Sequence, residues 1–228
     1  MVKIKMMRFP YIAYSNKVAI EPIFKNLTGE PLILDMSVNS NIFTDSGVDV
    51  RDQKSLQKLL DDMMHDRYTW GVSSYLENRE ILLSQCPQMV EEKRFYHLGL
   101  DIIVPLGTPL HAPLDAKVKE SGYEDGEGNY GSYVLLMHES PYFETFYSFY
   151  GHLKSDSLPG AGTDFKAGQI FSHIGDFHEN GNWFYHTHLQ VITEKGLEQG
   201  YISKGYCASK DLECMDTLCP SPLPLFRI

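Results

Sequence analysis

The sequence has little of several features that would each point to a class of protein. Four cysteines in 228 residues are too few for a disulfide scaffold, although Cys207, Cys214 and Cys219 cluster near the C-terminus. No stretch approaches the ~20 apolar residues of a membrane span. Basic residues are outnumbered, and the formal net charge of -10 argues against a nucleic-acid partner. We expect reduced thiols, with a Cys207–Cys219 bridge only in an exported protein.

The N-terminus has early lysines but lacks the other marks of an export signal. Arg8, Pro10 and Lys17 interrupt any apolar run, and no small-residue cleavage site follows. We therefore expect a cytoplasmic protein by default, with export by another route as the open alternative. The length suits one large domain, or a catalytic domain with an appended region, and gives no prediction of oligomeric state.

Hydrophobic spacing separates a helical N-terminal part from a strand-rich remainder. Apolar side chains recur at helical spacing from Asp52 to about Arg67, which predicts an amphipathic helix, and 75–83 is compatible with a second one. Short strand-like runs divided by glycine and proline turns follow at 131–138, 143–153 and 169–174. This pattern indicates a mostly β fold, with an antiparallel β-sandwich or barrel-sandwich hybrid core and an N-terminal α-containing extension.

Two stretches carry ligand-type side chains at strand spacing. In YHLGLDIIV (96–104), His97 and Asp101 face one side of an expected single strand, with only Gly99 between them. In WFYHTHLQVI (183–192), His186 and His188 share a face, and Trp183, Tyr185, Leu189 and Val191 are expected on the other. If the two strands pair, they offer three zinc ligands and a spare imidazole.

These motifs, with a third histidine in FYGHL (149–153), resemble the lysostaphin/LytM-type zinc metallopeptidases (metallopeptidase family 23, duplicated hybrid motif domain). That family carries H-x-x-x-D, a central histidine and H-x-H in the same order. The resemblance implies Zn²⁺ bound by His97, Asp101 and His188. It also implies His152 and His186 as the catalytic pair that does not bind the metal.

The resemblance also implies a domain plan and an activity. We expect an N-terminal extension with one or two helices packed on the core (1–90), a LytM-like zinc peptidase domain (91–195) and an irregular C-terminal tail (196–228). The implied reaction is hydrolysis of a peptide or amide bond, with peptidoglycan-type peptides among the candidates. The likeness is closest to the version inside phosphotransferase/aminotransferase fusion proteins, which leaves small-molecule substrates open.

The chemistry of the motifs is consistent with that activity. Two imidazoles and one carboxylate leave zinc an open position for an acidified water. No H-E-x-x-H helix supplies a glutamate base, so a histidine must take the proton. A non-catalytic metal-binding module of a metabolic or envelope-associated assembly is one alternative, and a histidine phosphocarrier of glucose-specific IIA type is another. The intact H-x-H disfavours the phosphocarrier.

Other side chains are weaker candidates for contact with a substrate. They are His111, His138, His173, His178, Tyr130 and Tyr150. The glycine-rich loop 121–131 carries Glu124, Asp125 and Glu127, and it is expected to be a mobile wall of a cleft or a solvated hairpin tip. His65 is expected to be a partner of the helix C-terminus rather than a catalyst.

Overall fold

The computed structural model describes residues 18–49, 52–84, 86–126 and 128–228. The expectations for residues 1–17, and the side chain of Glu127 in the acidic loop, therefore lie outside the described residues.

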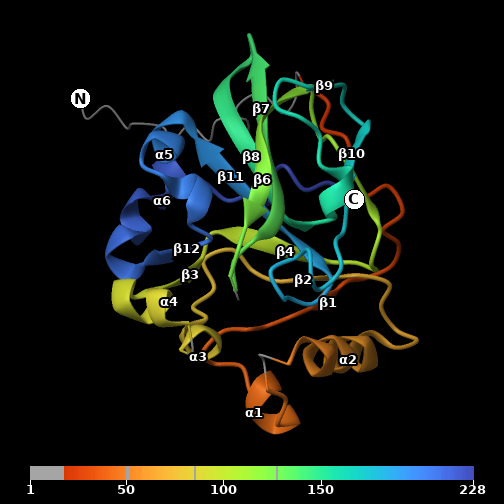
Figure 1. Ribbon diagram of the computed structural model, residues 1–228, viewed down its shortest axis with the longest axis vertical. Helices are drawn as coiled ribbons and strands as arrows, with labels where there is room; N and C mark the ends of the chain where they lie inside the picture. The colour runs from red at the N-terminus through yellow and green to blue at the C-terminus, as the bar shows by residue number, and fades with distance from the viewer. Residues whose placement is uncertain (1–17, 50–51, 85, 127) are drawn as a thin grey trace, which may run out of the picture.

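Eight strands form one sheet in the order β1-β2-β4-β11-β8-β7-β6-β9 (Figure 1). Their bounds are Leu32–Ile33 (β1), Gly71–Val72 (β2), Gly99–Ile103 (β4), Ala116–Glu124 (β6), Gly131–Ser140 (β7), Phe143–Leu153 (β8), Asp164–Phe165 (β9) and His186–Thr193 (β11). Among these described strands, only the β1–β2 pair is parallel. The expected mostly β fold is confirmed, and the sheet does not close into a barrel.

Two smaller sheets and several short helices complete the described fold. The small sheets pair Pro109–His111 (β5) with Ile170–His173 (β10), and Arg94–His97 (β3) with Tyr206–Ala208 (β12). The α-helices are Ile42–Ser46 (α1), Gln53–Met64 (α2), Glu80–Leu83 (α3), Pro87–Glu92 (α4), Glu194–Glu198 (α5) and Met215–Leu218 (α6). Helical 3-10 turns span Ser155–Ser157 (η2), Tyr201–Ser203 (η3) and Ser209–Cys214 (η4).

The predicted amphipathic helix is α2. Asp52 caps its N-terminus by accepting a hydrogen bond from the backbone N–H of Ser55. Leu56 and Leu60 on its inner face are buried in an apolar cluster with Ile103. Burial of this face attaches the extension to the large sheet, and α1 and α2 lie together at the bottom of the molecule in Figure 1.

The second predicted helix is much shorter than 75–83, since α3 spans only Glu80–Leu83. The preceding residues instead bond to β3. The backbone N–H of Leu76 donates to the carbonyl of His97, and that of Arg79 donates to the carbonyl of Phe95. Pairing with a strand satisfies these backbone groups and outweighs helix propensity.

The predicted single strand 96–104 is broken at Leu98. β3 pairs with β12, whereas β4 joins the large sheet, and the N–H of Leu98 donates to the carbonyl of Gly205. Both faces of β4 are buried. Leu100 contributes to the main core, and Ile103 packs on the other side against the α2 cluster.

The C-terminal segment is not the irregular tail that we expected. It contains β12, η4 and α6, and Leu225 is fully buried in the main core beside Phe226. Apolar burial fixes its position. Cys207 and Cys219 are buried thiols that form no disulfide.

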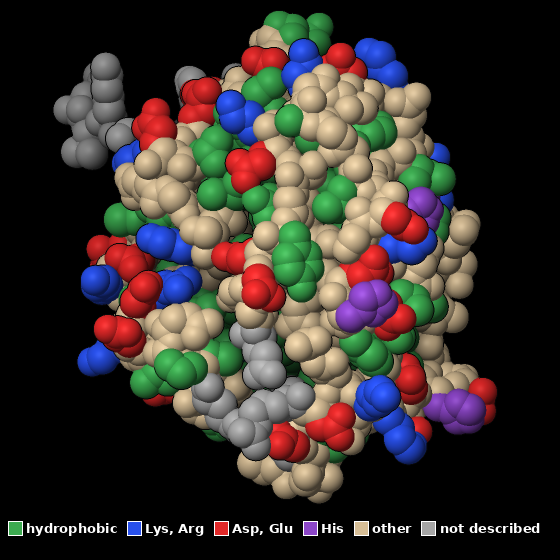
Figure 2. Space-filling view, viewed as in Figure 1, with side chains coloured by type: hydrophobic (Ala, Val, Ile, Leu, Met, Phe, Trp, Pro, Cys, Tyr) green, Lys and Arg blue, Asp and Glu red, His purple; other side chains and the backbone are tan. Residues whose placement is uncertain are grey.

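On the face shown in Figure 2, acidic and basic side chains are interspersed, without a broad basic patch. Within the described part of the chain, no helix combines the length and the apolar character needed to cross a membrane.

Candidate metal centre

The two histidine-bearing motifs meet because β11 and β4 are antiparallel neighbours. Their register places His188 opposite Asp101. His97 ends β3, and only Leu98 separates it from Gly99, where β4 begins. His97, Asp101 and His188 are all buried, and their ligand-type atoms lie within 4.8 Å of one another. The structure therefore brings together the three residues for which a zinc-binding role was predicted, and that role stays a prediction.

Hydrogen bonds fix which ring nitrogen of each histidine carries the proton. Nδ1 of His97 donates to the carbonyl oxygen of Ser74 at 3.2 Å, which leaves Nε2 unprotonated with its lone pair free. Nε2 of His188 donates to Oε1 of Gln190 at 3.0 Å, which leaves Nδ1 as a lone pair. The amide of Gln190 is oriented because its nitrogen donates to two backbone carbonyls. Such partners are typical of metal-binding histidines.

Three unprotonated acceptor atoms, Nε2 of His97, Nδ1 of His188 and Oδ1 of Asp101, thus lie together without a proton between them. Nε2 of His97 lies 2.9 Å from Nδ1 of His188, and these atoms lie 3.2 and 3.3 Å from Oδ1 of Asp101. Tetrahedral coordination at ~2.0–2.2 Å places ligand atoms roughly 3.3–3.6 Å apart. The two distances to Asp101 are close to this spacing, whereas the two histidine nitrogens are closer together than it. A divalent cation between the three atoms would remove the repulsion between their lone pairs, so the chemistry of the donor set fits zinc.

The charge states of these groups suit a metal. Burial tends to raise the pKa of the Asp101 carboxyl, but the charge of the neighbouring Arg79 guanidinium holds that pKa well below its usual value. Burial and the charge of Arg79 lower the pKa of His97 to about 3. At neutral pH the centre therefore offers a carboxylate and a neutral His97 imidazole, the forms that bind metals.

His152 and His186 lie side by side next to this cluster, with ring centroids 4.3 Å apart. Nδ1 of His152 donates to the carbonyl of Asn180 at 2.7 Å, and Nδ1 of His186 donates to that of Phe184 at 2.8 Å. Both rings therefore keep a lone pair at Nε2. Burial lowers the pKa of His186 to about 4, and it lowers the pKa of His152 well below its ordinary value.

The backbone of His152 is in the left-handed region, with φ of 64°. A non-glycine residue in this conformation is strained, and such strain clusters at functional sites. The N–H of His152 donates to the carbonyl of Tyr130, which helps to hold the ring beside His186.

A cavity of about 20 Å³ lies at this cluster, with room for about one water molecule. Its wall includes Gly128, Tyr130, Trp183 and Tyr206. Trp183 was expected on the face opposite the histidines. It instead precedes β11 and lies 6.4 Å from His186 between ring centroids, because strand alternation begins only at His186.

The weaker candidates from the sequence differ in whether they line this cavity. Tyr130 lines the cavity, whereas His111, His138, His173, His178 and Tyr150 are not among the residues that do. His111 and His138 are buried, and each donates from Nδ1 to a backbone carbonyl. In the acidic loop, Glu124 ends β6 and its carboxylate accepts from the N–H of Tyr130. The exposed His65 pairs with Asp66.

Sequence reasoning missed Arg79, which also lines the cavity and pairs with Asp101. Arg79 lies in the segment 75–83, which was interpreted as a helix from the sequence. The alternation of Ser73, Glu77 and Arg79 at odd positions was the available signal of an extended conformation.

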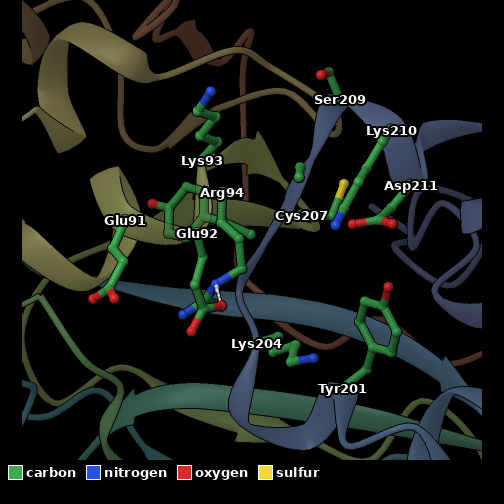
Figure 3. A pocket seen from close by; sticks show the side chains of 12 residues that line it. Glu91, Glu92, Lys93, Arg94, Tyr201, Lys204, Cys207, Ser209, Lys210 and Asp211 are labelled. Carbon is green, nitrogen blue, oxygen red and sulfur yellow. Dashed lines mark ion pairs between the residues drawn. The ribbon is translucent and has the colours of Figure 1, made fainter.

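A larger cavity of about 460 Å³ lies nearby, between residues 91–94 and 201–211. Figure 3 shows both segments around it, with an ion pair between Arg94 and Glu92. Its walls mix acids and bases, and they carry none of the ligand-type histidines. Tyr206 lines both cavities.

A family model matches part of the chain. Residues 95–199, a little under half of the chain, match the model of Peptidase family M23. No curated protein sequence matches the chain.

Solved structures of three proteins that resemble this chain illustrate the likeness. A zinc-containing peptidase from Vibrio cholerae is 26% identical, with 42% of this chain and 27% of that chain covered and a TM-score of 0.35. The catalytic domain of lysostaphin from Staphylococcus simulans is 20% identical (57% and 78% covered, TM-score 0.39). The catalytic domain of a mutant of the prophage-encoded M23 protein EnpA from Enterococcus faecalis is 21% identical (50% and 75% covered, TM-score 0.36).

Proposed function

We propose that this chain is a zinc-dependent metallopeptidase-like hydrolase that cleaves a peptide or amide bond at the centre formed by His97, Asp101 and His188. The convergence of three unprotonated ligand atoms within 2.9–3.3 Å is the observation that carries the proposal. The match of residues 95–199 to Peptidase family M23 supports it independently.

Zinc, when bound, would polarise a carbonyl oxygen and lower the pKa of a water to ~7. The chain itself supplies the proton transfers. Nε2 of His152 and Nε2 of His186 are neutral acceptors, held in place by the carbonyls that bind their Nδ1 protons. Because the rings are 4.3 Å apart, a proton on one disfavours a proton on the other. One ring therefore accepts a proton while the other stays neutral, and the proton is returned to the leaving amine.

The substrate class has two candidates. Peptidoglycan-type peptides follow from the family resemblance. Small amides are the second candidate, because the motifs also resemble the version of this domain inside phosphotransferase/aminotransferase fusion proteins, which suggests small-molecule substrates. Both contain an amide carbonyl and a leaving nitrogen, so the same residues serve either substrate.

The small volume of the cavity favours a second candidate, a non-catalytic metal-binding module. About 20 Å³ does not admit a peptide. Catalysis therefore requires that the wall formed by Gly128, Trp183 and Tyr206 moves when a substrate binds.

The test is metal analysis of the purified protein, followed by turnover assays on glycine-rich peptides, muropeptides and small amides. We expect about one zinc per chain, and cleavage that is lost with a chelator and restored by zinc. Stoichiometric zinc without turnover of any substrate would favour the binding module. A protein that takes up no zinc would refute both candidates.

A further inference from the structure

Arg79 is a buried cation in contact with the metal centre. Its side chain is 2% exposed, and Nη1 lies 2.8 Å from Oδ2 of Asp101. It belongs to the segment 71–79, which precedes the family-matched residues 95–199. The zinc centre of the proposed function thus has a charged neighbour from outside the matched region.

The guanidinium is held on all sides. Nε donates to Oε2 of Glu77 at 2.7 Å, and Nη2 donates to Oγ of Ser73 at 2.7 Å. Nη1 also donates to the hydroxyl of Tyr206 at 3.3 Å. Four partners for five N–H groups leave little freedom for Arg79 to bind a substrate, so its contacts point to a positioning role.

The two oxygens of Asp101 have separate partners. Oδ1 faces His97 and His188, whereas Oδ2 pairs with Arg79 and accepts from Oγ of Ser73 at 3.1 Å. The Ser73 hydroxyl also accepts from the backbone N–H of Asp101 at 3.2 Å. With Oδ2 occupied in this way, only Oδ1 is available at the centre.

We propose that Arg79, supported by Ser73, is a positioning residue that holds Asp101 as a single-oxygen metal ligand. This inference rests on the proposed zinc centre. It makes the segment 71–79 part of the site, since Arg79 and Ser73 both contact Asp101. The same segment supplies the carbonyl of Ser74, which fixes the proton of His97.

A purely structural ion pair would also link this segment to the sheet, so the experiment must separate ligand geometry from stability. Arg79→Met removes both the positive charge and the N–H groups with which the guanidinium contacts several partners at once. Arg79→Lys keeps the charge but cannot contact Asp101, Ser73 and Glu77 together, and it serves if the methionine variant does not fold. The matched control is Arg94→Met, because Arg94 is a mostly buried arginine paired with Glu92 and has no contact with Asp101.

Each folded protein is stripped of metal and titrated with Zn²⁺ against a chromophoric chelator, and its Co²⁺ form is examined by visible absorption. We expect both Arg79 variants to lose roughly 10–100-fold in zinc affinity, the usual effect of losing an outer-shell partner. We also expect weaker cobalt bands, because a released Asp101 can bind through both oxygens and raise the coordination number. Arg94→Met should keep the affinity and the spectrum of the parent.

Parent-like affinity and spectrum in a folded Arg79 variant would overturn the positioning role and leave the zinc centre intact. An equal loss in Arg94→Met would attribute the effect to general destabilisation and overturn it too. A parent that binds neither metal would overturn the proposed centre itself, and the role of Arg79 with it.

Discussion

His188 and Asp101 stand directly opposite each other on β11 and β4, with Nδ1 of the histidine 3.3 Å from Oδ1 of the aspartate. The pairing register alone sets this relationship. A shift by one residue would turn one of the two side chains to the other face of the sheet. The Asp101–His188 half of the candidate centre is therefore set by the large sheet, whereas His97 is contributed by β3 of a small sheet.

The first prediction is that His188→Ala abolishes stoichiometric zinc binding, since it removes one of three converging ligand atoms. Metal analysis after dialysis measures the loss. His178→Ala is the control, because that histidine is exposed and does not line the cavity. Full zinc retention in the His188 variant would show that the ligand set has been assigned wrongly.

The second prediction separates ligands from proton carriers. Alanine at His152 or His186 should leave about one zinc in place and lower kcat by ~10²–10⁴-fold, the range typical of acid–base groups. Steady-state kinetics on a cleaved substrate and metal analysis of the same sample provide the two readouts. Zinc loss in the His186 variant would make that residue a ligand instead.

The third prediction concerns Gly99, where any side chain would meet His188. An added Cβ would lie 2.5 Å from Cε1 and 2.7 Å from Nε2 of His188, and 2.8 Å from the carbonyl oxygen of Leu189. Gly99→Ala must therefore displace the imidazole or spread the strands. We expect a loss of ~1–3 kcal/mol in the free energy of unfolding, as in other overpacked sites, together with weaker zinc binding.

Gly160→Ala is the matched control for this substitution, because no heavy atom lies within 4 Å of its added Cβ. Chemical denaturation measures the free energy of unfolding of both variants, and zinc titration measures their metal binding. If Gly99→Ala behaves like Gly160→Ala in both measurements, the close approach to His188 has no consequence for the site.

Sequence patterns could single out the side chains that meet here because ligand chemistry and strand periodicity are local properties, whereas their division into metal ligands and proton carriers came from the family resemblance and stays a prediction. His97 and Asp101 are four residues apart, and His186 and His188 are two apart, so a short stretch reveals each pair. The break at Leu98 could not be predicted in this way, because it depends on a carbonyl from Gly205, more than a hundred residues downstream. Local alternation continues through the break.

Arg79 and Trp183 were missed for a related reason. The segment before Arg79 was predicted to be helical, but its backbone groups form hydrogen bonds with β3 instead. Whether a helix or strand pairing is favoured depends here on contacts that exist only in the folded chain. Trp183 was assigned to the wrong face because the strand begins later than its apolar pattern suggests. The assignment of the C-terminal residues as an irregular tail failed because Leu225 fills a core formed by distant strands.

The last prediction concerns a buried histidine outside the centre. His138 is fully buried on β7, where Nδ1 donates to the carbonyl of Asp115 and Nε2 accepts from the hydroxyl of Ser148. Burial lowers its pKa to about 4. In the unfolded chain the pKa is ~6.5, so the unfolded state binds more protons between these two values.

The stabilising contribution of neutral His138 is therefore complete above about pH 6.5 and is lost as the pH falls towards 4. A shift of this size corresponds to at most about 3 kcal/mol. In urea denaturation from pH 7.5 to pH 4.5, the free energy of unfolding of the parent should fall more steeply than that of His138→Gln, which cannot titrate. The two slopes are compared because His138→Gln also weakens hydrogen bonds, and that loss is the same at every pH. Parallel slopes would show that His138 keeps an ordinary pKa in the folded protein and that its burial costs little.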